Sequence, residues 1–184
     1  MSEQQIADKK SLSATGTEAF NLESAASYQN PEHMAHLSAV NLLPHMQRIN
    51  VLIVEDDITM QPLWEHILVS INPNVSIRWS KSEEGAEIIM NRKIINDQEF
   101  DLIIVDIYLS GLKTGIDLWE RYRFCDSLFL FTSSMSVKEF TEKLIKYDDE
   151  YIPFYMKKPI KKEVAVETIK AMLAFKKFLI YKGH

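Results

Sequence analysis

Short apolar strands alternate with helical segments along most of this chain, and this alternation limits the fold more than any other feature. Asn50–Glu55 reads NVLIVE and Asp101–Val105 reads DLIIV, so both runs are apolar on both faces. Strands that are buried on both faces and separated by helices form parallel sheets covered by helical layers. The sequence therefore predicts an α/β fold built on a doubly wound parallel sheet.

The alternation continues through five strand–helix units, which predicts a (βα)5 arrangement with a five-stranded sheet. Strands are expected at Asn50–Glu55, Val75–Trp79, Asp101–Val105, Leu128–Phe131 and Ile152–Met156. Helices are expected at Met60–Ile71, Ser82–Arg92, Gly115–Phe124, Ser136–Tyr147 and Lys161–Tyr181. Ser136 and Glu139 have the spacing of a capping box, and Ser82 is suited to cap the helix that follows it.

The character of the chain changes near residue 48. Residues 1–30 are rich in Ser, Ala, Thr, Gln and Asn, and bury too little apolar surface to offset the entropy of ordering them. Residues 31–43 begin with a proline and place Met34, Leu37, Val40 and Leu43 on one stripe, which suits a short helix. We expect a flexible arm over 1–48 with a short helix at 31–43, or else a fully disordered leader, ahead of one domain over 49–184.

Composition excludes several classes of protein. The formal charge of -5 gives no reason to expect nucleic acid as a partner. Cys125 is the single cysteine, which excludes an internal disulfide and a multi-cysteine zinc site. No apolar run approaches the ~20 residues that span a bilayer, and the amino terminus has no signal-peptide pattern. We expect a cytoplasmic protein that uses neither a membrane nor nucleic acid.

Polar residues follow four of the predicted strands. In parallel α/β sheets, ligands bind beside the carboxyl ends of the strands. The residues at these ends are Glu55, Asp56 and Asp57 after the first strand, Asp106 after the third, Thr132, Ser133 and Ser134 after the fourth, and Lys157, Lys158 and Pro159 after the fifth. Carboxylates, a hydroxyl and an ammonium are thereby expected at one edge of the sheet.

Each of these groups suits phosphoryl chemistry. Clustered carboxylates are tolerated when a hard cation neutralises them, and Mg2+ prefers oxygen ligands and also binds phosphate. A carboxylate can attack phosphorus to give an acyl phosphate, while a lysine supplies a point charge for the phosphoryl oxygens. Phosphoryl transfer needs little beyond alignment and charge neutralisation.

Four runs, VLIVEDD, DLIIVDIYLSG, LFLFTSS and YMKKPI, resemble the receiver domain of two-component response regulators over about Asn50–Tyr181. This resemblance implies a flavodoxin/CheY-like fold and makes Asp106 the phosphoacceptor. It further implies a Mg2+ site formed by Glu55, Asp56, Asp106 and the backbone carbonyl of Tyr108. Asp57 and Lys157 remain alternatives to their neighbours in the acidic pair and at the lysine position.

The resemblance also implies the residues of the switch. Thr132 would be the switch hydroxyl, Lys158 would bind the phosphoryl group, and Tyr155 would be the switch aromatic. The peptide bond between Lys158 and Pro159 is often cis in this family. Tyr108, Ser133 and Ser134 would tune the site. Ser133 stands where the family usually has alanine, and a bulky Tyr108 would hinder water and slow the loss of the phosphoryl group.

The expected function is that of a stand-alone response regulator, which takes its phosphoryl group from a histidine kinase or a histidine phosphotransfer protein. It would signal through a protein–protein surface to an unknown downstream target, and would not be an enzyme beyond its own phosphorylation and dephosphorylation. Surplus apolar residues on the last helix, such as Phe175 and Phe178, suit a homodimer or partner contact.

Three alternatives remain open. The chain could be a phosphorelay intermediate that passes the group to another histidine, or a scaffold that keeps the receiver fold and signals without phosphate. The complete acidic set argues against the scaffold. A metal-dependent phosphatase on another α/β fold would place a second aspartate at position 108, where this chain has Tyr108.

Overall fold

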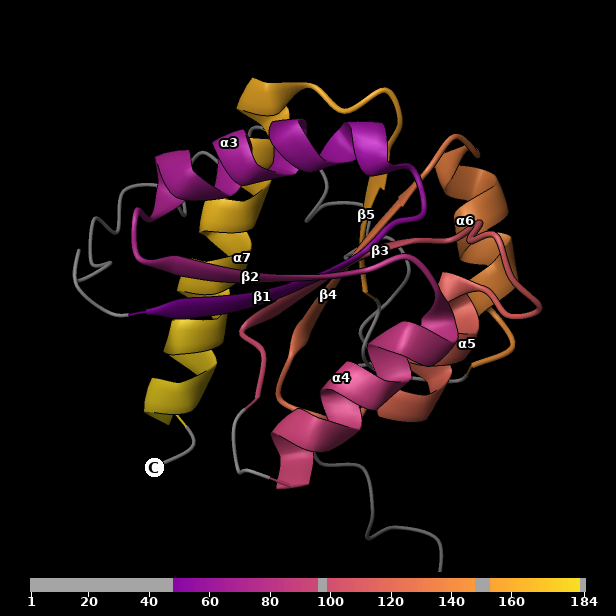
Figure 1. Ribbon diagram of the computed structural model, residues 1–184, viewed down its shortest axis with the longest axis horizontal. Helices are drawn as coiled ribbons and strands as arrows, with labels where there is room; N and C mark the ends of the chain where they lie inside the picture. The colour runs from indigo at the N-terminus through magenta and orange to yellow at the C-terminus, as the bar shows by residue number, and fades with distance from the viewer. Residues whose placement is uncertain (1–47, 96–98, 148–152, 183–184) are drawn as a thin grey trace, which may run out of the picture.

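The computed structural model describes residues 48–95, 99–147 and 153–182, and these form one parallel sheet between two helical layers (Figure 1). The strand order is β2-β1-β3-β4-β5, and every neighbouring pair is parallel. The strands are β1 (Ile49–Val54), β2 (Val75–Ser80), β3 (Leu102–Asp106), β4 (Leu128–Ser133) and β5 (Phe154–Lys157). The predicted five-stranded, doubly wound (βα)5 fold is confirmed.

The helices differ from the predictions mainly at their ends. They are the 3-10 helix η1 (Ile58–Met60), α3 (Gln61–Ile71), α4 (Glu83–Ile95), α5 (Gly115–Tyr122), α6 (Val137–Leu144) and α7 (Lys162–Lys182). The helix expected to run to Tyr147 ends at Leu144, and the helix expected from Met60 is preceded by the separate η1 turn.

The two faces of the sheet carry separate apolar cores. Helices α3 and α7 cover one face, and α4, α5 and α6 cover the other (Figure 1). Strand β1 feeds both cores, because Leu52 and Val54 point to one face and Val51 and Ile53 to the other. All four of these side chains are buried, at about 1.5–3 kcal/mol for each fully buried aliphatic side chain. This rigid centre fixes the strand ends that carry the polar groups.

Local capping sets where the helices start. Ser136 and Glu139 form the predicted capping box at α6, and the amide of Gly85 donates to the hydroxyl of Ser82 before α4. A second capping box at the start of α5, formed by Thr114 and Asp117, was not predicted. It begins α5 directly after the loop that follows β3.

The predicted arm over 1–48 and its helix at 31–43 lie almost entirely outside the described residues, which start at Arg48. Within the part of the chain that the structure describes, no helix is long and apolar enough to cross a membrane.

Candidate phosphoacceptor site

The carboxyl ends of β1, β3, β4 and β5 bring the predicted polar residues to one edge of the sheet. Glu55 and Asp56 directly follow β1, and Asp106 is the last residue of β3. Asp106 pairs in register with Thr132 of β4, whose next neighbour in the sheet is Met156 of β5. The strand order therefore brings the carboxyl ends of β1, β4 and β5, which are distant in sequence, to the region around Asp106.

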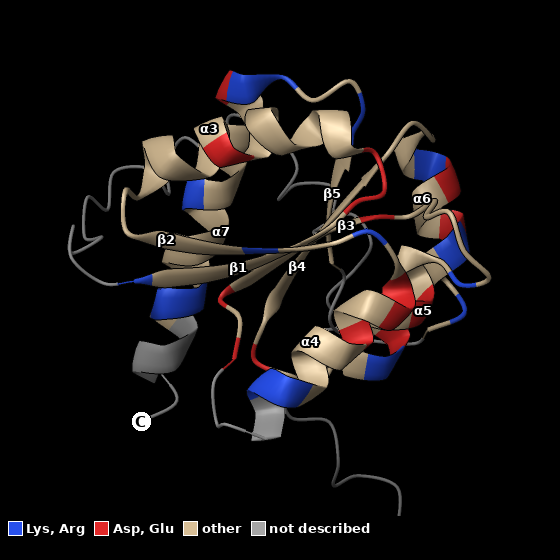
Figure 2. Cartoon of the chain, viewed as in Figure 1, with Lys and Arg blue, Asp and Glu red and all other residues tan. Residues whose placement is uncertain are grey.

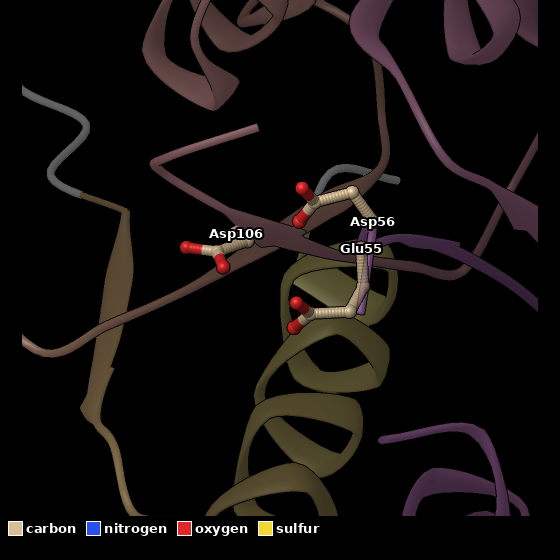
Figure 3. A group of neighbouring side chains, drawn as sticks. All are labelled: Glu55, Asp56 and Asp106. Atoms are coloured by element: carbon tan, nitrogen blue, oxygen red, sulfur yellow. The ribbon is translucent and has the colours of Figure 1, made fainter. Parts of the chain in front are cut away.

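Three carboxylates meet at this edge (Figure 3). Glu55, Asp56 and Asp106 each offer a carboxylate oxygen, and these oxygens lie within 4.8 Å of one another. Glu55 and Asp106 are 1% and 7% exposed, whereas Asp56 is half-buried and accepts a hydrogen bond of 3.1 Å from the amide of Ser110. Asp56 is thus the most accessible of the three to an ion arriving from solvent.

Lys158 is the cation in contact with this cluster. Its Nζ donates to both oxygens of Glu55, at 3.0 and 2.8 Å, and to Oδ2 of Asp106 at 2.6 Å. Burial acts against the charged form of Lys158, but the hydrogen bonds and charges of Asp106 and Glu55 outweigh it and raise the pKa of the ammonium. Burial raises the pKa of the Glu55 carboxyl, which the hydrogen bond from Lys158 opposes.

The donor set fits a magnesium ion. Mg2+ takes carboxylate oxygens and keeps several waters, and three carboxylates facing one ammonium leave uncompensated negative charge for it to neutralise. The amide of Tyr108 donates to Oδ1 of Asp106 at 3.1 Å, so the backbone of the predicted fourth ligand lies beside the Asp106 carboxylate. Whether the Tyr108 carbonyl binds the ion stays a prediction.

The two alternative residues, Asp57 and Lys157, have contacts that differ from those of Asp56 and Lys158. Asp57 caps η1, where its Oδ1 accepts from the amide and hydroxyl of Thr59, so its side chain serves the turn and is not in the carboxylate cluster. Lys157 is exposed, whereas Lys158 reaches Glu55 and Asp106. The Lys158 amide donates to the carbonyl of Ser133 at 2.7 Å, and the Lys158–Pro159 bond is cis, as predicted.

The three hydroxyls at the carboxyl end of β4 differ in their partners. Thr132 is 1% exposed, and its Oγ1 is buried with no hydrogen-bond partner among the described residues. Ser133 is also buried, but its Oγ accepts from the amide of Met135 at 3.3 Å. Ser134 is exposed. Thr132 is therefore the hydroxyl left available to a new acceptor at Asp106.

Tyr155 lies inward, under the loop that follows β4. Its hydroxyl lies 2.6 Å from the carbonyl of Met135, to which it donates, and 3.1 Å from that of Ser133, and its ring stacks on Phe140 at 4.5 Å between centroids. Burial raises the pKa of this hydroxyl, which keeps it a donor. The side chain predicted to be the switch aromatic thus holds the loop that begins beside Thr132.

Sequence reasoning missed one pair next to the site. Lys113, in the loop after β3, donates to both carboxylate oxygens of the buried Glu83 at the start of α4, at 3.4 and 3.1 Å. The two residues are thirty positions apart, and no local pattern pairs them.

Comparisons with known proteins give the fold. No protein-family model and no curated protein matches the chain. Solved structures do match the chain. A two component response regulator from Cytophaga hutchinsonii is 20% identical, with a TM-score of 0.56, over 69% of this chain and 98% of its own.

Two further structures agree with it. A CheY-like response regulator receiver domain from Methylobacillus flagellatus is 19% identical, with a TM-score of 0.53, over 68% and 99%. A two-component response regulator from Clostridium difficile is 18% identical, with a TM-score of 0.53, over 68% and 95%. The described part of this chain therefore has the CheY-like fold of response regulator receiver domains.

Proposed function

We propose that this chain is a response regulator receiver that accepts a phosphoryl group on Asp106 in a Mg2+-dependent reaction. One observation carries the proposal: at the carboxyl edge of the sheet the Asp106 carboxylate contacts the ammonium of Lys158 and lies within 4.8 Å of carboxylate oxygens of Glu55 and Asp56. A nucleophile, a cation for the phosphoryl oxygens and an acidic metal site are what phosphoryl transfer requires.

The chemistry follows from these positions. An oxygen of Asp106 attacks the phosphorus of a phosphohistidine, the O–P bond forms as the P–N bond breaks, and the electron pair returns to the imidazole nitrogen. Glu55, Asp56 and Asp106 would hold a magnesium ion, which supplies positive charge against the phosphoryl oxygens and the carboxylates. Lys158 moves its hydrogen bond from the Asp106 carboxylate to a phosphoryl oxygen.

The switch uses the hydroxyl of Thr132, for which the described residues provide no hydrogen-bond partner before phosphorylation. Thr132 donates to the phosphoryl group, which gives its buried Oγ1 the acceptor that it lacks. Movement of Thr132 changes the space around Tyr155 and the loop that this tyrosine holds, so the surface of α6, β5 and α7 shifts between two pre-existing states. Water later attacks the acyl phosphate, and Tyr108, which is exposed beside the acceptor, slows that attack.

Partners and location belong to the same proposal. The donor is a histidine kinase or a histidine phosphotransfer protein, the output is a protein–protein contact with a downstream target, and the setting is the cytoplasm. The chain catalyses no reaction beyond its own phosphorylation and dephosphorylation.

The test uses beryllofluoride and acetyl phosphate. With Mg2+ present, we expect the full-length chain to gain one phosphoryl group from acetyl phosphate by intact mass and to bind beryllofluoride by fluorine NMR. Asp106→Asn should do neither, because its amide cannot act as the nucleophile. Asp101→Asn is the control, since Asp101 lies at the opposite end of β3 and should leave both reactions intact. An adduct on Asp106→Asn equal to wild type would disprove the proposal.

A further inference from the structure

The loop between β3 and α5, which we call the acceptor loop (107–114), is fixed firmly at its two ends. The amide of Ile107 donates to the carbonyl of Thr132, and that of Gly115 donates back to the carbonyl of Ile107. Thr114 caps α5. The ends of the loop are therefore held by the sheet and the helix, and its middle needs other support.

The middle of the loop is held at two places. Of the hydrogen bonds that the described residues Leu109–Lys113 make, those that leave the loop go to Asp56 and to Glu83. The amide of Ser110 donates to Oδ2 of Asp56 at 3.1 Å, and the Nζ of Lys113 donates to Glu83 at 3.4 and 3.1 Å. One attachment is thus to a predicted metal ligand, and the other is outside the metal site.

The contact between Lys113 and Glu83 is rigid at its Glu83 end, on helix α4. The Glu83 side chain is 0% exposed, and it lies in the first turn of α4, where the helix dipole favours a carboxylate. Lys113 is 38% exposed and lies 3.9 Å from Glu87 as well, which in turn contacts Arg121 of α5. Helices α4 and α5 lie side by side here (Figure 2). The lysine is therefore tied to a carboxylate that cannot move without breaking the packing of α4.

We propose that Lys113 is a positioning residue for the metal site: its contact with Glu83 anchors the acceptor loop, and so holds the Ser110 amide on Asp56 and the Tyr108 backbone beside Asp106. Lys113 is three residues from Ser110, a span that leaves the amide little freedom once both are attached. This inference rests on the proposed function for the identity of the ion. The contact between Lys113 and Glu83 does not depend on that function.

Two effects of the variant Lys113→Met on Mg2+ affinity have opposite signs, so the variant distinguishes positioning from through-space charge. Removing a lysine near an acidic site takes away a repelling charge, so Lys113→Met should bind Mg2+ more tightly if only through-space charge matters. Loss of positioning instead weakens binding, since Asp56 and the Tyr108 backbone lose their fixed arrangement. We expect the Mg2+ dissociation constant to rise by about tenfold, the low end of the effect of residues that support metal ligands.

The experiment measures Mg2+ affinity by calorimetry and the hydrogen-exchange rate of the Ser110 amide by NMR in the metal-free full-length chain. Lys113→Met should weaken Mg2+ binding and speed Ser110 exchange, and Lys113→Arg should restore both, because a guanidinium can still bind the Glu83 carboxylate. Lys138→Met is the matched control: it removes a lysine from the Lys138–Glu142 pair on α6, which is 85% and 62% exposed, and should change neither quantity.

A double variant protects the test against misfolding. Lys113→Met with Glu83→Gln removes both charges, leaves no buried carboxylate without its cation, and keeps the net charge of the chain. It should still show weaker Mg2+ binding and faster Ser110 exchange. If wild type binds Mg2+ and the variants keep its affinity and its Ser110 exchange rate, the positioning role is wrong. If wild type itself binds no Mg2+, the proposed function fails, while faster Ser110 exchange in the variants would still establish the anchor.

Discussion

The buried hydroxyl of Thr132, which has no hydrogen-bond partner among the described residues, costs the folded chain free energy. A buried polar atom without a partner loses its water and gains nothing in exchange, a penalty of about 1–3 kcal/mol. Valine has nearly the same shape and suits a central strand. We expect Thr132→Val to raise the free energy of unfolding by about 1 kcal/mol in urea, the low end of that range. The same variant should bind beryllofluoride without the structural change that the proposed switch predicts for wild type.

Ser133 provides the contrast at the next position. Its Oγ accepts from the amide of Met135, so Ser133→Ala leaves that buried amide without an acceptor and should lower the free energy of unfolding. A loss of stability in Thr132→Val as large as that in Ser133→Ala would show that the Thr132 hydroxyl already has a partner, and would remove the physical basis of the switch.

At the scale of the elements, the start of α5 packs so closely against β3 that position 115 has no room for a side chain. A Cβ added at Gly115 would lie 2.3 Å from the carbonyl oxygen of Asp106 and 2.6 Å from Cγ2 of Val105. Since both belong to the buried carboxyl end of β3, neither can move away cheaply. We expect Gly115→Ala to lower the free energy of unfolding by about 2–3 kcal/mol, the cost of overpacking, and to slow phosphorylation of Asp106.

Gly111, in the same loop, is the matched control. Its added Cβ would meet only Oε2 of Glu84, at 3.9 Å, which is ordinary contact, so Gly111→Ala should change the unfolding free energy by less than about 0.5 kcal/mol. Chemical denaturation of both variants and phosphorylation by acetyl phosphate provide the comparison. Equal stability of the two would contradict the close packing of α5 on β3.

Local patterns predicted the elements well because their causes are local. The apolar runs of β1 and β3 and the Ser136–Glu139 capping box depend on residues only a few positions apart, and each lies where it was expected. The Lys113–Glu83 pair depends instead on the packing of α4 beside the acceptor loop. No spacing rule reaches across that distance, so the pair appears only once the fold is known.

On the scale of the whole molecule, the site is a product of the strand order. The order β2-β1-β3-β4-β5 puts β1 and β4 on either side of β3, and so places Glu55 and Thr132 beside Asp106. Sequence alone predicted which residues would gather, because each follows a strand. It could not predict that Lys158 would bind Glu55 as well as Asp106, or that Asp57 would serve η1, since side-chain direction at a strand end depends on the neighbouring loops.

If this convergence forms the proposed magnesium site, the stability of the molecule should depend on Mg2+. Three carboxylates within 4.8 Å face one ammonium, so an ion that binds the folded state and not the unfolded chain relieves their repulsion. At a Mg2+ concentration one hundred times the dissociation constant, the free energy of unfolding should rise by about 2.7 kcal/mol, and a chelator should reverse the gain. Thermal unfolding at several Mg2+ concentrations measures the effect.

Variants of the neighbouring residues Asp56 and Asp57 distinguish a metal-binding site from a general effect of charge. Asp56→Asn should lose most of the Mg2+-dependent gain, because it removes an oxygen charge from the cluster. Asp57→Asn makes the same change in net charge one residue away, at an exposed side chain that caps η1, and asparagine caps as well as aspartate does. Asp57→Asn should therefore keep the full Mg2+ response. Equal losses in the two variants would mean that Mg2+ acts by screening the acidic surface, and that the three carboxylates at the end of β1 and β3 do not form a binding site.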